Sequence, residues 1–144
     1  MSSKQVHTDR FRRTRADHES EVAEDYLEAI SDIELAQGEC RGADLARLFS
    51  VSHATVTQTV SRLRDAELVA PEPYGPIRLT KSGARVAQEA RKRHEIVFRF
   101  LLSIGVCEDV ASVDAEGIEH HVSAKTLSCM QKLISDEFRE RKIE

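Results

Sequence analysis

What the sequence lacks excludes several classes of protein. It lacks a long apolar run, because the longest, residues 96–104, is interrupted by Arg99. No segment is therefore expected to span a membrane. The polar, arginine-rich beginning lacks the apolar stretch of a secretory signal. Cys40, Cys107 and Cys129 are odd in number and widely spaced, which argues against a disulfide scaffold and a structural zinc site. We therefore expect a cytoplasmic chain with reduced thiols and no membrane partner.

A net charge of −4 also argues against general attraction to nucleic acid, but the charges are unevenly placed. Residues 1–16 hold five basic side chains and one acid, and residues 40–85 hold seven basic side chains and four acids. Residues 108–144 hold nine acids and five basic side chains. The basic N-terminal regions and the acidic C-terminal region predict two different functions within one chain. Ordinary solvated surfaces could carry the same charges.

Apolar residues recur at helical spacing over most of the chain. Residues 1–18 lack this periodicity and are predicted to form a flexible basic tail. Ser52, Thr80 and Ser123 are candidate N-caps. The predicted helices cover residues 19–37, 43–49, about 53–64, 81–103, about 108–121 and about 124–141.

A short hairpin is predicted between the third and fourth helices. Residues 67–70 and 77–79 favour strands, and the prolines and glycine between them favour a turn. Helix, three-residue turn, helix and hairpin is the order of a winged helix-turn-helix, whose second helix enters the DNA major groove. Leu45 and Leu48 are expected to hold the first helix of the pair against the second. The fold class is therefore mostly α with a small β-hairpin wing.

The free face of the helix at 53–64 carries small and polar side chains, which allow close approach to a groove floor. Gln58 suits an adenine edge, whereas Ala54 and a threonine methyl suit the thymine methyl. Basic residues that suit phosphate contacts are Arg62, Arg64, Arg78 and Lys81. The predicted DNA-binding residues are Ser52, Ala54, Thr55, Thr57, Gln58, Ser61, Arg62 and Arg78. The open alternative is a helix-turn-helix that makes only protein contacts.

Two acidic clusters fall on predicted helices. Asp25 and Glu28 are spaced i, i+3, so they share one helix face. Glu116, Glu119 and His120 are spaced i, i+3, i+4 and share another. Taken singly, such clusters are more often solvated surface than metal ligands, and a lone mid-helix histidine such as His94 is more often a packing residue.

Taken together, these motifs resemble the diphtheria toxin repressor family, and specifically its manganese transport regulator branch. The resemblance covers about residues 20–140 and rests on the strings at 25–28, 56–60, 93–95 and 114–121. After the flexible basic tail at 1–18, it implies an N-terminal winged helix-turn-helix at 19–86 and a C-terminal helical metal-binding and dimerisation domain at 87–144. It also implies a homodimer that binds a palindromic operator in double-stranded DNA.

The resemblance further implies a dinuclear site with two Mn(II) ions per subunit. The positions that match the family's metal ligands are Asp25, Glu28, His94, Glu116, Glu119 and His120. Carboxylates and imidazoles without a thiolate suit Mn(II). The iron-responsive branch carries methionine and cysteine at the positions of Asp25 and Glu116, so this sequence departs from that branch. His121 lies outside the matched set.

The function expected from these features is a Mn(II)-responsive transcriptional repressor of manganese-uptake genes, not an enzyme. An Fe(II)-responsive regulator and a metal-independent winged-helix regulator remain alternatives. A dinuclear hydrolase or oxidase is a third, but helical di-iron oxidases need paired Glu-x-x-His motifs, which this cluster does not have.

Overall fold

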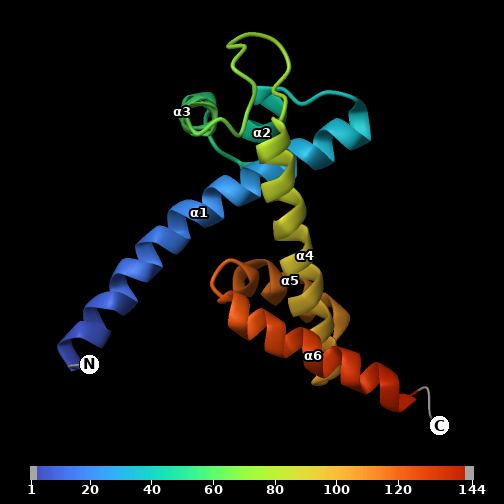
Figure 1. Cartoon of the computed structure of the whole chain (residues 1–144). Helices are drawn as coiled ribbons and strands as arrows, with labels where there is room; N and C mark the ends of the chain where they lie inside the picture. The colour runs from blue at the N-terminus through green and yellow to red at the C-terminus, as the bar shows by residue number, and fades with distance from the viewer. Residues whose placement is uncertain (1–2, 142–144) are drawn as a thin grey trace. The chain divides into compact units, whose positions relative to one another are not determined.

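The structure is a computed structural model that describes residues 3–141, with side chains for residues 18–137. Its helices are α1 (Ser3–Gln37), α2 (Gly42–Phe49), α3 (His53–Asp65), α4 (Lys81–Ser103), α5 (Glu108–Glu119) and α6 (Ala124–Arg141) (Figure 1). The chain divides into two compact units. One is Glu19–Glu89, and the other is Ala90–Glu144 with Met1–His18, so α4 contributes to both. In the described range, none of the helices has both the length and the apolar character that a bilayer span requires.

Helix α1 begins earlier than the sequence predicts. Residues 3–18 continue it without a break, because no glycine or proline occurs before Gly38 to interrupt helical hydrogen bonding. The helix ends as predicted, at Gly38, whose φ of 90° lies in the left-handed region that favours glycine. The flexibility of the basic segment stays a prediction.

The Glu19–Glu89 unit has its core where α1, α2 and α3 meet. Leu45 is buried as predicted, but the prediction for Leu48 is wrong, since its side chain is 58% exposed. The inner face of α2 is completed by Ala46 and Phe49 instead, and the Phe49 ring stacks on Tyr26 with centroids 4.6 Å apart. Other buried residues of this core are Leu27, Ile30, Val56, Val60, Leu63 and Val69.

Local hydrogen bonds define where the helices of this unit begin. The Arg41 N–H donates to the Asp44 carboxylate over 2.8 Å, and this bond, with a contribution from Gln37, lowers the pKa of Asp44. The N–H of Thr55 donates to the Ser52 hydroxyl over 3.2 Å, which confirms Ser52 as the N-cap of α3.

The predicted wing is reduced to bridges, which corrects the small β-hairpin of the predicted fold class. Within residues 3–141 no extended strand forms; antiparallel bridges join Val69 to Leu79 and Cys40 to Ile77. Glu67, the first residue of the first predicted strand, has a φ of 59°, which is not extended, and Pro71 and Pro76 next to the predicted strands have no N–H with which to lengthen the ladder.

The first turn of α4 packs tightly against the base of this wing segment. The Thr80 hydroxyl accepts the N–H of Gly83 over 3.1 Å and donates to the carbonyl of Glu67 over 2.7 Å, which confirms Thr80 as the N-cap. A Cβ at Gly83 would lie 2.0 Å from the carbonyl oxygen of Leu68. Only glycine therefore permits this approach.

The Ala90–Glu144 unit packs α5 and α6 against the second half of α4 (Figure 1). Its core is formed by Val97, Ala115 and Leu127. Along α5, Ala111, Ala115 and Glu119 are buried at i, i+4, i+8, so the inner helix face ends in a carboxylate. The Ser123 hydroxyl accepts the N–H of Thr126, as its predicted role as N-cap of α6 requires.

Candidate metal centre and nucleic-acid interface

Three predicted metal ligands converge inside the Ala90–Glu144 unit. His94 comes from α4, while Glu116 and Glu119 come from successive turns of α5. Nδ1 of His94 lies 3.5 Å from Oε1 of Glu116 and 3.6 Å from Oε1 of Glu119. One donor atom from each side chain lies within 4.8 Å of the other two.

The chemistry of this cluster suits a cation. Nδ1 of His94 is buried and has no hydrogen-bond partner among the described side chains, because both carboxylate oxygens are too distant for a good hydrogen bond. Donor atoms that share one divalent ion stand roughly 3 to 3.5 Å apart, given metal–ligand bonds of about 2.1 Å. A divalent ion would also offset the free-energy cost of burying the charged carboxylate of Glu119, whose side chain is fully buried. Both the donor types of the cluster and the distances between its donor atoms therefore suit a divalent metal ion.

His120 extends the cluster. Its Nε2 lies 3.6 Å from Oε1 of Glu119, and its side chain is 1% exposed. Asp25 and Glu28 belong to the other unit, where they stand one turn apart on α1 and are half-buried. The structure thus brings four of the six predicted ligands together within one unit.

The cysteines contribute no donor to this cluster. All three thiols are free, and Cys107 and Cys129 are exposed. Cys40 is buried in the other unit, and its burial, with the nearby charges of Asp44 and Glu34, raises the pKa of its thiol to about 11. A thiol in this state is protonated at neutral pH and is a poor metal ligand.

The predicted DNA-binding residues are all exposed, and those on α3 share one face of that helix. On α3, Val56, Val60 and Leu63 turn inward. The predicted residues, all exposed, are Ser52, Ala54, Thr55, Thr57, Gln58, Ser61, Arg62 and Arg78. Some of their hydroxyls bond within the helix, since Thr57 donates to the carbonyl of His53 over 2.9 Å. The Gln58 amide and the methyls of Ala54 and Thr57 are groups of the kind that would suit a base edge.

Arg64 has a role that the sequence did not reveal. Its guanidinium donates to the carbonyl of Ala70 and to that of Glu72, each over 3.3 Å. These bonds tie the end of α3 to the wing segment, so Arg64 orients the wing, while its phosphate contact stays a prediction. No local sequence signal marks this contact, because its acceptors are backbone carbonyls.

Two family models match successive parts of the chain. Residues 18–77 match the family model described as the iron dependent repressor N-terminal DNA binding domain. Residues 80–139 match the iron dependent repressor metal binding and dimerisation domain. The chain belongs to the iron-dependent repressor family.

Curated relatives in this family carry the name MntR. The transcriptional regulator MntR of Escherichia coli O157:H7 is 41% identical over 131 residues, which cover 91% of this chain and 84% of that protein. The protein of the same name from Salmonella typhimurium is 43% identical over 121 residues, covering 84% and 77%. The HTH-type transcriptional regulator MntR of Bacillus subtilis is 34% identical over 111 residues, covering 77% and 78%. The resemblance to the manganese branch of the family is confirmed.

Solved structures give the same family. A manganese-dependent transcriptional repressor in complex with manganese is similar with a TM-score of 0.70 and 29% identity over 78% of this chain. The manganese regulator SloR is similar with a TM-score of 0.67 and 26% identity over 78% of this chain. The chain spans about half the length of these proteins, 52% and 53% respectively.

Proposed function

We propose that this family member is a Mn(II)-responsive transcriptional repressor that binds operator DNA as a homodimer and controls manganese-uptake genes. The observation that carries the proposal is the cluster of His94, Glu116 and the buried Glu119, which offers only nitrogen and oxygen donors. Hard and borderline donors without a thiolate suit Mn(II). The relatives named MntR support the same metal.

The proposed ligand set is the one that the family resemblance implies, with two Mn(II) ions per subunit. Its members are Asp25, Glu28, His94, Glu116, Glu119 and His120. The spacing of the last four and the burial of Glu119 and His120 support their part in it. For Asp25 and Glu28 the support is the i, i+3 spacing on α1 together with the family resemblance.

Metal binding would act as the switch between inactive and active repressor. Bound Mn(II) supplies positive charge that draws the carboxylates together. Without it, the carboxylates of Glu116 and Glu119 repel one another. If Asp25 and Glu28 also bind the ions, metal binding would connect α1, the helix that precedes the helix-turn-helix, with α4 and α5. The two DNA-binding domains of a homodimer would then be held at a spacing that matches a palindromic operator.

An Fe(II)-responsive repressor is the second candidate. The matching family models are described as domains of an iron dependent repressor, and nitrogen and oxygen donors also bind Fe(II). Manganese is favoured because Asp25 and Glu116 are carboxylates at positions where the iron branch carries softer ligands. A metal-independent regulator would leave the buried Glu119 carboxylate without a function.

Metal-dependent recognition of DNA tests the proposal directly. Duplexes selected from a random library by the full-length chain in Mn(II) should share a palindrome and bind by fluorescence anisotropy at physiological salt. A chelator should remove this binding, and Mg(II) should not restore it. Equal affinity with and without chelator would refute the proposal, while restoration by Fe(II) but not by Mn(II) would favour the second candidate.

Substitution of Gln58 by alanine tests the reading face of α3. The amide should contact an adenine edge, so Gln58→Ala should weaken operator binding by about 1–3 kcal/mol and relax base choice at one position. Competition assays with every base at each operator position measure both effects. Gln131→Ala, at an exposed position of α6, is the matched control. An unchanged affinity and base preference for Gln58→Ala would show that this face does not read the operator.

A further inference from the structure

The first part of α1 is strongly basic and has no role in either site described above. Residues 1–16 hold five basic side chains and one acid, whereas the rest of the chain holds sixteen basic side chains and twenty-four acids. Residues 10–15, here named the arginine segment, contain four arginines, namely Arg10, Arg12, Arg13 and Arg15. The segment precedes residues 18–77, so the match to the family's DNA binding domain gives it no function.

Packing does not account for the arginine segment. Between residues 3 and 18 the only large apolar side chains are those of Val6 and Phe11, and their i, i+5 spacing places them on different faces of the helix. The four arginines form two pairs spaced i, i+3, a spacing at which like charges repel one another and weaken a helix. A neighbouring polyanion would relieve this repulsion. The segment therefore has the charge of a binding surface and lacks the pattern of a packed helix.

We propose that the arginine segment is a second DNA-binding surface, which binds phosphates of the duplex in addition to the α3 face that would read its bases. The inference rests on the proposed function, because it requires a repressor that binds operator DNA. The chain itself holds the segment at the DNA-binding unit, since only three residues separate Arg15 from Glu19, where that unit begins, and the backbone of α1 is helical throughout.

The residue type suits this role. The planar guanidinium of arginine can donate two parallel hydrogen bonds to one phosphate, and its charge is retained at any physiological pH. Basic N-terminal segments of this kind are typical of nucleic-acid-binding proteins. Contacts to phosphates increase affinity but carry no sequence information. The segment is therefore expected to strengthen binding without changing which operator is chosen.

A membrane surface suits the segment less well than DNA does. Helices that bind lipid headgroups also carry an apolar face, rich in tryptophan, phenylalanine or leucine, which enters the boundary of the acyl chains. Residues 3–18 have no such face, because Val6 and Phe11 lie on different sides of the helix. Double-stranded DNA requires only the positive charge.

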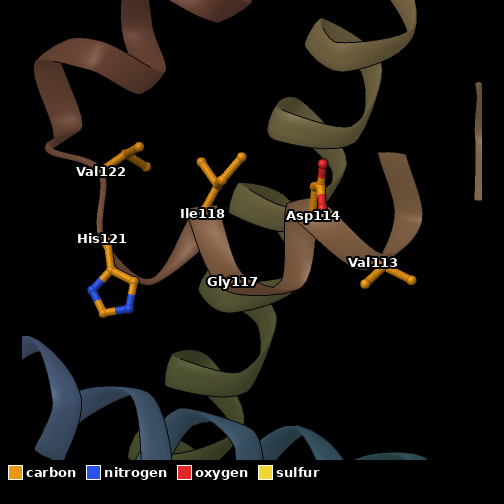
Figure 2. A pocket seen from close by; sticks show the side chains of 6 residues that line it. All are labelled: Val113, Asp114, Gly117, Ile118, His121 and Val122. Atoms are coloured by element: carbon orange, nitrogen blue, oxygen red, sulfur yellow. The ribbon is translucent and has the colours of Figure 1, made fainter. Parts of the chain in front are cut away.

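Helix α5 offers DNA no equivalent surface. Residues 108–119 hold five carboxylates and no lysine or arginine, so phosphates would be repelled. The hollow at this helix is lined mainly by Val113, Ile118 and Val122 and carries the carboxylate of Asp114 (Figure 2). Exposed lysines do occur on α4 and α6, and they provide the control for the experiment.

Neutralisation of the arginine segment tests the proposal. The operator affinity of the Mn(II)-loaded full-length chain should be measured by fluorescence anisotropy at several salt concentrations. In the variant Arg10→Gln, Arg12→Gln, Arg13→Gln, the slope of log K against log salt should become less steep by at least about 2, because each phosphate contact contributes about 0.9 and a homodimer has two such segments. At physiological salt, affinity should fall by at least about 10-fold, for the operator and for a scrambled duplex alike.

Two control variants separate the local charge from net charge and from folding. Lys92→Gln, Lys125→Gln, Lys132→Gln makes the same change in net charge at exposed positions of α4 and α6, and it should keep the wild-type slope. Lysine at the three substituted arginine positions preserves the charge and should keep most of the slope. All variants should retain the wild-type circular dichroism and Mn(II)-induced thermal stabilisation, since glutamine and lysine form helices about as well as arginine.

Each remaining result counts against the proposal. A wild-type slope and affinity in the arginine variant would refute it, and so would an equal loss of slope in the lysine control, because the effect would then belong to net charge. Vesicles that contain phosphatidylglycerol and bind wild type but not the arginine variant, with operator binding unchanged, would assign the segment to a membrane instead. If wild type binds no duplex in Mn(II), the proposed function itself fails, and the inference with it.

Discussion

Substitution of Glu119 by glutamine should abolish the response to Mn(II) without destabilising the metal-free protein. Glu119 is 1% exposed and lies 3.6 Å from both His94 and His120, at the centre of the donor cluster. Glutamine keeps the shape but removes the charge that would bind the ion. Operator binding in Mn(II) should fall by at least about 100-fold, because even residues that only orient metal ligands cost about 10- to 100-fold when mutated.

Thermal unfolding with and without Mn(II) separates this effect from misfolding. Wild type should gain about 2.7 kcal/mol when Mn(II) is about 100-fold above its Kd, and Glu119→Gln should gain almost nothing. Without metal, the variant should be at least as stable as wild type, because a buried charge has been removed. Glu137→Gln, an exposed position of α6, is the control. A full Mn(II)-induced stabilisation of Glu119→Gln would exclude Glu119 as a ligand.

Joint substitution of Asp25 by asparagine and Glu28 by glutamine should separate metal binding from activation. Both carboxylates lie on α1, outside the unit that contains His94, Glu116, Glu119 and His120. Wild type should bind two Mn(II) ions per chain, and the double variant should retain only an ion held by the α4 and α5 ligands. Its operator affinity in Mn(II) should remain that of the metal-free protein. A complete switch from about 1:99 to about 99:1 corresponds to roughly 10⁴-fold in differential binding.

The number of Mn(II) ions per chain, from mass spectrometry, and the operator affinity, from titration, should be measured on the same samples. Glu19→Gln with Asp32→Asn makes the same chemical changes at exposed positions of α1 and should behave as wild type. Normal operator binding by the Asp25→Asn, Glu28→Gln variant would remove both residues from the switch. Two ions retained without activation would make them coupling residues rather than ligands.

Much of the fold could be predicted because local chemistry determines it. The bounds of α4 and α6 and the end of α1 were predicted correctly, since Ser123, Thr80 and Gly38 mark them with caps that operate within one turn. The i, i+3, i+4 spacing predicted that Glu116, Glu119 and His120 share a helix face. Only the family resemblance marked them as metal ligands.

What the sequence alone could not decide depended on contacts between distant segments. Leu48 has the right spacing to pack inward, yet Phe49 takes that place because Tyr26 of α1 offers it a stacking partner. The predicted wing strands shrink to bridges held partly by Arg64, whose acceptors are backbone carbonyls that carry no sequence signal.

Local patterns thus determined most helix bounds and their caps, because each depends on residues within one or two turns. Tertiary structure alone decided that Glu119 is buried beside His94, because α4 and α5 meet there only once Val97, Ala115 and Leu127 have packed. It alone also showed that a Cβ at Gly117 would meet no atom of the described residues within 4 Å, because open space beside a helix depends on where the other elements lie.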